Sequence, residues 1–331
     1  MRTERIDVVG GFTVDAIIRA DGSWVTGQFG GNALWASMGV RLLGAPVAAH
    51  SVVGADYPVG ALSAISAHGV DLTGVRRDTE TPNARITYAY GADGSREQPA
   101  PAGAVAVLPE RVRGEFADTT RDPAITMASL PDGRALAGLP GLPGSAWHLG
   151  LLPPARFAEL VAVLRGAGAA YIQADCPARS ELRRDGDGAL RRRLADVDVF
   201  LPSTSDTDVF APGVDRRELV ARFHDYGAPV VVMKCAAEGA WVSDARSGAR
   251  WAVPAFDGDG VDIDATGAGD VFCGAFAAAF VGGADLLDAA VVASACASYA
   301  LRVASPLDLT PPAGDDLAGR IHRIRNGVES L

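Results

Sequence analysis

The second half of the chain alternates between short apolar stretches and amphipathic stretches, and this alternation constrains the fold more than any other feature of the sequence. The apolar stretches, typical of buried strands, are 146–150 (AWHLG), 169–175 (AAYIQAD), 197–203 (VDVFLPS), 229–235 (PVVVMKC) and 240–244 (AWVSD). Helical stretches are expected between them at 156–165, 182–194 and 216–226. Regular alternation of strand and helix predicts a mostly parallel central sheet covered by helices on both faces, which is a three-layer α/β/α fold.

Two hairpin signals in the first half, at 15–31 and at 84–97, do not fit this alternation. We expect them to pair as a small β lid, formed by approximately 12–32 and 84–99, over the carboxyl edge of the sheet. The lid belongs to a single domain of residues 1–331 in this interpretation. Segment 99–143 is rich in proline, glycine and arginine, and it predicts only weak strand and loop.

The composition limits the classes of partner. The formal net charge is -10, with 40 acidic and 30 basic residues, and this argues against nucleic acid as the main partner. The start of the chain lacks the apolar core of a signal peptide, and no apolar run is long enough to span a membrane, so we expect a soluble cytoplasmic protein. The four cysteines form no CxxC pair and are expected to be small core residues.

The stretch DATGAGD (264–270) precedes an almost wholly apolar helix and predicts an anion-binding site. Gly267, Ala268 and Gly269 have little or no side chain, so their backbone N–H groups at the helix start can approach a negative ligand closely. Asp270 lies in the first turn of the helix, where its carboxylate can accept a proton from a substrate hydroxyl. A buried apolar helix would hold this arrangement rigidly.

Other interpretations of the stretch are weaker. A phosphate-binding P-loop needs a lysine followed by serine or threonine, but Lys234, the only lysine, is followed by cysteine. The dinucleotide-binding pattern would need glycine where Phe272 stands. A plain helix cap by Thr266 or Asp264 remains open, although two glycines between two carboxylates exceed what a cap requires.

DATGAGD followed by VFCGAF resembles the C-terminal signature of the ribokinase-like (PfkB) carbohydrate kinases, with Ala265 at a position that is usually threonine. The resemblance implies the ribokinase-like fold and transfer of the γ-phosphoryl group of ATP to a hydroxyl group. It implies that Asp270 is the catalytic base, and that the anion hole is formed by Gly267, Ala268 and Gly269.

The N-terminal part resembles the acceptor-binding part of the same family. VVGGFTVDAI is similar to the family's first strand, and the resemblance implies that Asp15 binds substrate hydroxyls; the alternative is a turn residue. FGGNALWASMGV is similar to the signature in which Gly30 and Gly31 open a helix beneath the acceptor, with Asn32 close by. Trp35 stands where an asparagine is usual, and it is either a core residue or a platform for a base.

Three further stretches resemble the nucleotide side of the family. Ser203 to Asp206 replaces the N-x-x-E motif, so the resemblance implies a metal-linked role for Asp206. VVVMKCAAEGAWVSD resembles the nucleotide strand, with Lys234 and Gly239 matching and Ala236 replacing a glycine. The lysine is expected near the phosphates as a mobile point charge. Segment 293–305 falls where the family lines the adenine pocket.

These features predict an ATP- and Mg²⁺-dependent sugar kinase whose cofactor side also includes Asp264 and Thr266. Some members of the family hold K⁺ beside these two positions. The acceptor is a small sugar or sugar-like molecule, with a nucleoside kinase or a non-catalytic ligand-binding protein as alternatives. A homodimer through the lid is an expectation from analogy alone.

Overall fold

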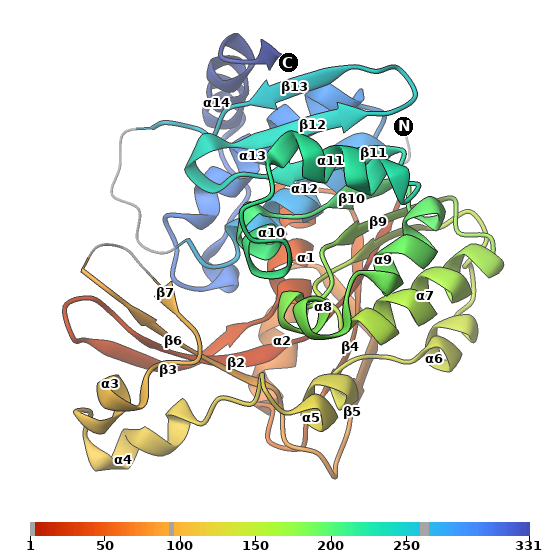
Figure 1. Ribbon diagram of the computed structural model, residues 1–331. Helices are drawn as coiled ribbons and strands as arrows, with labels where there is room; N and C mark the ends of the chain where they lie inside the picture. The colour runs from red at the N-terminus through yellow and green to blue at the C-terminus, as the bar shows by residue number, and fades with distance from the viewer. Residues whose placement is uncertain (1–3, 93–95, 259–264) are drawn as a thin grey trace.

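The computed structural model describes residues 4–92, 96–258 and 265–331 (Figure 1). Ten strands within these residues form one large sheet in the order β14-β13-β12-β11-β10-β9-β8-β1-β4-β5. Their bounds are β1 Ile6–Val9, β4 Val47–Val53, β5 Val70–Arg77, β8 Ala146–Leu149, β9 Tyr171–Asp175, β10 Val199–Leu201, β11 Val230–Lys234, β12 Ala240–Asp244, β13 Arg250–Val253 and β14 Glu329–Ser330. The strands from β11 to β5 in this order are all parallel, and β12, β13 and β14 pair antiparallel. The prediction of a mostly parallel sheet is therefore confirmed.

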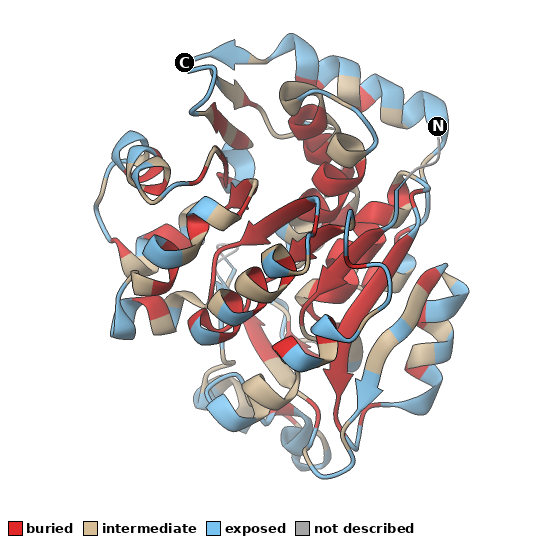
Figure 2. Cartoon of the chain, turned by 90° about the vertical axis from the view of Figure 1, so that its right-hand side faces the viewer, coloured by how far each residue is buried: buried red, intermediate tan, exposed pale blue. Residues whose placement is uncertain are grey.

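Helices cover both faces of this sheet, because each face carries its own apolar cluster. One face is covered by α1 Asn32–Leu42, α2 Val59–Ala67, α12 Ala268–Val281, α13 Leu286–Ala300 and α14 Gly314–Asn326. The other is covered by α6 Gly133–Ala137, α7 Pro154–Gly166, α8 Arg179–Asp185, α9 Gly188–Arg193 and α11 Arg216–Asp225. Figure 2 shows the strands buried between helices whose outer surfaces are exposed. No helix in the described part of the chain combines the length and apolarity that crossing a membrane requires.

A second, four-stranded sheet has the order β3-β2-β6-β7 and lies to one side of the large sheet (Figure 1). Its strands are β2 Thr13–Ile18, β3 Trp24–Gly30, β6 Arg85–Tyr90 and β7 Arg96–Glu97. The two expected hairpins meet in it through the parallel pairing of β2 with β6. We call this sheet the lid sheet.

The prediction of weak strand and loop for 99–143 is wrong. The segment contains the short helices α3 Ala102–Ala106, α4 Glu110–Arg113, α5 Pro123–Ala128 and α6 Gly133–Ala137. Two of them begin at aspartates, Asp122 and Asp132, whose side chains accept hydrogen bonds from backbone N–H groups in the first turn. Residues of the first two helices pack against the lid sheet in a small apolar cluster of their own. Because the segment is rich in arginine and proline, its short helices could not be recognised from the sequence pattern.

Two other elements differ from expectation. The single helix expected at 182–194 is divided into α8 and α9, because Gly186 adopts a left-handed conformation with φ of 78° and ends the first of them. Helix α14 and strand β14 at the C-terminus were not predicted. The apolar side of α14, including Ile324, packs onto the core beside α13.

Candidate active site

The DATGAGD stretch forms the start of α12, and its conformation depends on glycine. Gly267 is left-handed, with φ of 79°, and it is the N-cap residue of α12. A Cβ atom at Gly267 would lie 2.1 Å from the ring of Trp35 on α1, so no larger residue fits there. Residues Val271 to Ala278 of α12 are buried. The amide end of a rigidly packed helix is thus presented at the carboxyl edge of the sheet.

Asp270 lies in the first turn of α12 and is half-buried. Burial raises the pKa of its carboxyl to about 7, and the negative charge of Asp175 adds to this effect, while the positive charge of Lys234 opposes it. A carboxylate whose pKa is close to neutral pH is well suited to accept a proton from an alcohol. The N-cap residue of α12 is Gly267, so Thr266 does not cap this helix.

Lys234 is held by an acid that the sequence analysis missed. Its Nζ lies 2.9 and 2.8 Å from the two carboxylate oxygens of Asp175 and 3.3 Å from Sγ of Cys273. The lysine is only 9% exposed, so the expectation of a mobile point charge is wrong. It lies beside the motif, because a Cβ atom at Gly269 would be 3.8 Å from Nζ, and its place near a nucleotide stays a prediction. The signal that could have found Asp175 is a carboxylate that ends a buried strand at the edge where the motif lies.

Asp206 is buried close by, in the first turn of α10 Thr204–Phe210. It forms a capping box with Ser203: Oδ2 accepts hydrogen bonds from the serine N at 3.0 Å and from its Oγ at 2.5 Å. Burial raises the pKa of Asp206, and the charge of Asp175 adds to this effect. Ser203, which stands where the family has asparagine, is therefore the N-cap residue of α10.

The metal-linked role of Asp206 stays a prediction. Among the residues that the structure describes, no group of three or more His, Cys, Asp or Glu side chains could hold a metal ion. Mg²⁺ is usually bound through one or two carboxylates together with water and substrate phosphates. The donor set at this edge therefore fits a magnesium ion that arrives with a nucleotide, and it does not fit an all-protein cage.

The predicted acceptor residues meet at the base of the lid sheet. Asp15 is 5% exposed, and its Oδ1 accepts a hydrogen bond from Thr13 Oγ1 at 2.6 Å. A Cβ atom at Gly30 would lie 2.1 Å from Oδ2 of Asp15, so this glycine makes room for the carboxylate. Gly31 is the N-cap of α1, and a Cβ atom there would lie 2.2 Å from the backbone oxygen of Gly11.

Asn32 connects three strand ends. Its Oδ1 accepts a hydrogen bond from Gly11 N at 2.8 Å, and its Nδ2 donates one to Leu151 O at 2.9 Å. These contacts tie the loops that follow β1 and β8 to the start of α1. The oxygen and the nitrogen of this side chain both form hydrogen bonds with backbone atoms. A role of Asn32 in acceptor binding stays a prediction, and it would have to be compatible with these two bonds.

The lid sheet touches the motif directly. Tyr90 Oη on β6 lies 2.7 Å from Thr266 Oγ1, and Arg96 on β7 donates to the same oxygen at 3.3 Å. The Arg96 guanidinium also lies over the ring of Tyr88, 4.9 Å from its centroid. Burial raises the pKa of Tyr88, and the charges of Asp15 and Asp270 raise it further. Tyr88, Asp15 and Asp270 therefore lie in one region, next to the contact between Tyr90 and Thr266.

The two positions that correspond to glycines in the family's nucleotide strand, Ala236 and Gly239, both have a positive φ. Gly239 has φ of 94°, and a Cβ atom there would lie 2.1 Å from Val253 O. Ala236, at the position of the other family glycine, is also left-handed, with φ of 49°. Alanine thus occupies a conformation suited to glycine. Asp264 lies outside the described residues.

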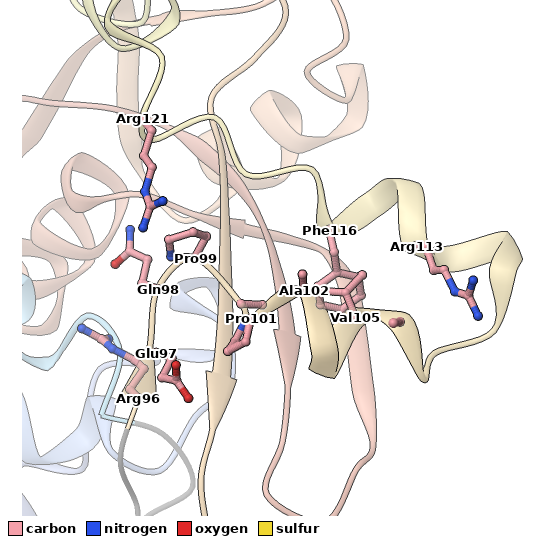
Figure 3. Close-up of a pocket in the computed structure, with 12 residues that line it drawn as sticks. Arg96, Glu97, Gln98, Pro99, Pro101, Ala102, Val105, Arg113, Phe116 and Arg121 are labelled. Atoms are coloured by element: carbon pink, nitrogen blue, oxygen red, sulfur yellow. The ribbon is translucent and has the colours of Figure 1, made fainter.

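A cavity of about 920 Å³ is lined by β7, by the loop that follows it and by residues between 102 and 121. Figure 3 shows Arg96 and Arg121 at one end of it and Arg113 pointing away at the opposite end. The basic groups therefore do not converge on one point. Arg96 is the residue that links this cavity to the motif.

A three-layer α/β/α domain with a second, small sheet beside the start of a buried helix is the arrangement of the ribokinase-like fold. Comparison with known proteins agrees: the family described as pfkB family carbohydrate kinase matches residues 158–311, a segment that contains the motif. The resemblance to this family that the motif indicated is thereby confirmed.

Individual relatives are distant but cover nearly the whole chain. A cytidine kinase of Thermococcus kodakarensis is 25% identical over 84% of this chain and 89% of its own. The nucleoside kinase of Burkholderia thailandensis, solved with inosine, superposes with a TM-score of 0.71 at 17% identity over 96% of both chains. Aminoimidazole riboside kinase of Salmonella enterica, solved with its riboside and an ATP analogue, gives 0.71 at 20% identity over 96% of this chain and 100% of that one. The solved structures confirm the ribokinase-like fold.

Proposed function

We propose that the protein transfers the γ-phosphoryl group of ATP to a hydroxyl group of a sugar or a nucleoside. The observation that carries this proposal is Asp270: a half-buried carboxylate with a pKa of about 7, beside the amide end of α12 and beneath the lid sheet. In this proposal the residues 267–269 beside it form the anion hole, and the acceptor lies between Asp270 and the lid sheet.

The chemistry follows from this geometry. The acceptor hydroxyl gives its proton to the Asp270 carboxylate while its oxygen attacks the γ-phosphorus. The bond between this phosphorus and the bridging oxygen breaks, and ADP leaves with the electron pair. The backbone N–H groups of Gly267, Ala268 and Gly269 would stabilise the negative charge on the transferring group. Base catalysis of this kind typically contributes a factor of about 100 to 10,000.

Magnesium, when bound with the nucleotide, would neutralise charge on the phosphates, and Asp206 is the carboxylate that we propose to lie nearest to it. We place the nucleotide along Lys234, Gly239 and Thr266, with Asp264 completing this side. A potassium ion beside Thr266, a cytoplasmic location and a homodimer through the lid also remain proposals.

A nucleoside is the second candidate acceptor, and a specific observation favours it. Tyr90 lies on the part of the lid sheet that contacts Thr266 of the motif and is half-buried, so its ring offers aromatic surface to a base. The similarity to the cytidine kinase points the same way. Trp35 is not the platform, since it is 4% exposed and packed beneath Gly267.

The test is ADP release by the wild-type protein with Mg-ATP across a panel of sugars and nucleosides, beside the Asp270→Asn variant. We expect turnover with at least one acceptor and its loss in the variant. A protein that is stabilised by an acceptor in a thermal-shift screen but releases no ADP would be a ligand-binding protein on the same fold.

A further inference from the structure

Lys234, the only lysine of the chain, forms a buried ion pair with Asp175, which lies two strands away. The pair lies beside α12, the helix that begins at the motif. Lys234 ends β11 and Asp175 ends β9, with β10 between them. Parallel strands are about 4.8 Å apart, so the two strand ends are separated by about 10 Å. The long lysine side chain spans this distance and reaches both carboxylate oxygens, at 2.9 and 2.8 Å.

The hydrogen-bonding capacity of this lysine is already used. An ammonium group has three N–H donors. Nζ of Lys234 contacts the two oxygens of Asp175 and, at 3.3 Å, Sγ of Cys273 on α12. Asp175 also accepts a hydrogen bond from Cys176 N at 2.7 Å. A phosphate oxygen could bind the ammonium directly only by displacing one of these partners.

The pair is buried at the place where charge matters for phosphoryl transfer. Both residues are less than a tenth exposed. Burial by itself would lower the pKa of Lys234, but Asp175, Cys273 and Asp206 together outweigh this effect and the pKa is raised, so the lysine stays charged. The ammonium lies against Gly269 of the anion hole. Removing one member of a buried pair leaves the other uncompensated, which makes the two residues a unit.

We propose that Asp175 is a positioning residue of the kinase, which holds the Lys234 ammonium as a fixed charge beside the amide end of α12 instead of releasing it to bind a phosphate oxygen. This inference rests on the proposed function. The fixed ammonium supplements the backbone N–H groups as charge develops on the transferring group. Asp175 acts on the reaction only through the lysine.

The test compares Asp175→Asn, Lys234→Met and the double variant with the wild-type protein. Each substitution keeps the approximate shape and removes one charge. We expect each single variant to lower kcat about 100-fold and to leave KM for ATP within about threefold, because the lost interaction is realised in the transition state. Each should also lower Tm by about 5 °C or more.

The double variant separates a positioning role from a structural one. A neutral pair of similar shape is expected to restore Tm, since no buried charge is left unpaired. The proposal expects kcat to remain about 100-fold low in the double variant although Tm recovers. Asp198→Asn is the matched control: this acid pairs with Arg165 before β10, at the opposite edge of the sheet, and should lower Tm without lowering kcat.

Recovery of kcat in the double variant would show a purely structural pair and overturn the inference. A large rise of KM for ATP in Lys234→Met would overturn it as well, because it would show a direct phosphate ligand. A wild-type protein without transferase activity on any acceptor is a different result: it would overturn the proposed function, and this inference with it.

Discussion

Replacing Asp270 by asparagine should strongly lower turnover and at the same time stabilise the protein. The substitution keeps the shape of the side chain and removes its charge at the start of α12. On the rate, loss of a general base costs a factor of about 100 to 10,000. In the wild-type protein, a pKa of about 7 means that kcat/KM should fall about tenfold for each pH unit below neutrality and level off above it.

The effect on stability has the opposite sign. The pKa of Asp270 in the folded protein, about 7, lies above its ordinary value of 3.8, so the folded state binds this proton more tightly than the unfolded state. The carboxylate therefore destabilises the protein above about pH 7, and this effect shrinks as the pH falls and is gone below about pH 4. The difference between the two pKa values corresponds to about 4 kcal/mol as an upper limit. Because the side chain is half-buried and solvent screens it, we expect about 1–2 kcal/mol.

The assay is urea unfolding of both proteins at about pH 8 and about pH 5, beside pH profiles of ADP release. The Asn variant should be the more stable at the higher pH, by a margin that narrows at the lower pH. Asp315→Asn is the control, because Asp315 is also in the first turn of a helix but is exposed on α14. Equal stabilities at the higher pH, or a variant with a normal rate, would refute the assignment of Asp270 as a buried base.

Three further substitutions test the lid and the nucleotide strand. Gly30→Ala should displace Asp15 and raise KM for the acceptor at least about tenfold. Gly11→Ala is the control and should leave this KM unchanged, because its Cβ atom would meet no atom within 4 Å. If the two variants had similar KM values, Gly30 would not be the residue that makes room for Asp15. Ala236→Gly should raise the free energy of unfolding by about 1 kcal/mol in urea, since it relieves a left-handed alanine, and a loss of stability would count against this. Tyr90→Phe removes the hydrogen bond from the lid to the motif threonine and should raise KM for the acceptor about threefold to tenfold while Tm stays unchanged; an unaltered KM would show that this contact does not position the lid.

Local patterns in the sequence were enough for the parts of the site that lie within one stretch of chain. The alternation of strands and helices predicted the parallel sheet, and two small residues around Ala268 predicted the exposed amide end of α12. A local pattern marks Asp175 only as a carboxylate at the end of a buried strand. Its pairing with Lys234 cannot be predicted in this way, because the lysine is 59 residues further along and reaches it across an intervening strand. The order of the strands in the sheet decides which side chains at its edge can contact each other. The pattern of a single sequence does not contain that order.

The two signatures of the chain, around Gly31 and around Gly267, have a physical reason to occur together. The helices that they open, α1 and α12, pack with their backbones in contact: a Cβ atom at Gly39 would lie 2.4 Å from Val271 O, and one at Gly274 would lie 1.9 Å from Ala36 O. Glycines at these positions let the helices approach closely, as a close-packed interior requires. The distance between the start of α1, where we propose the acceptor, and the start of α12, where we propose the phosphates, is thereby fixed by main-chain contact. Substrate positioning on a scale of about 1 Å matters for phosphoryl transfer, so this contact joins the two halves of the site into one rigid body.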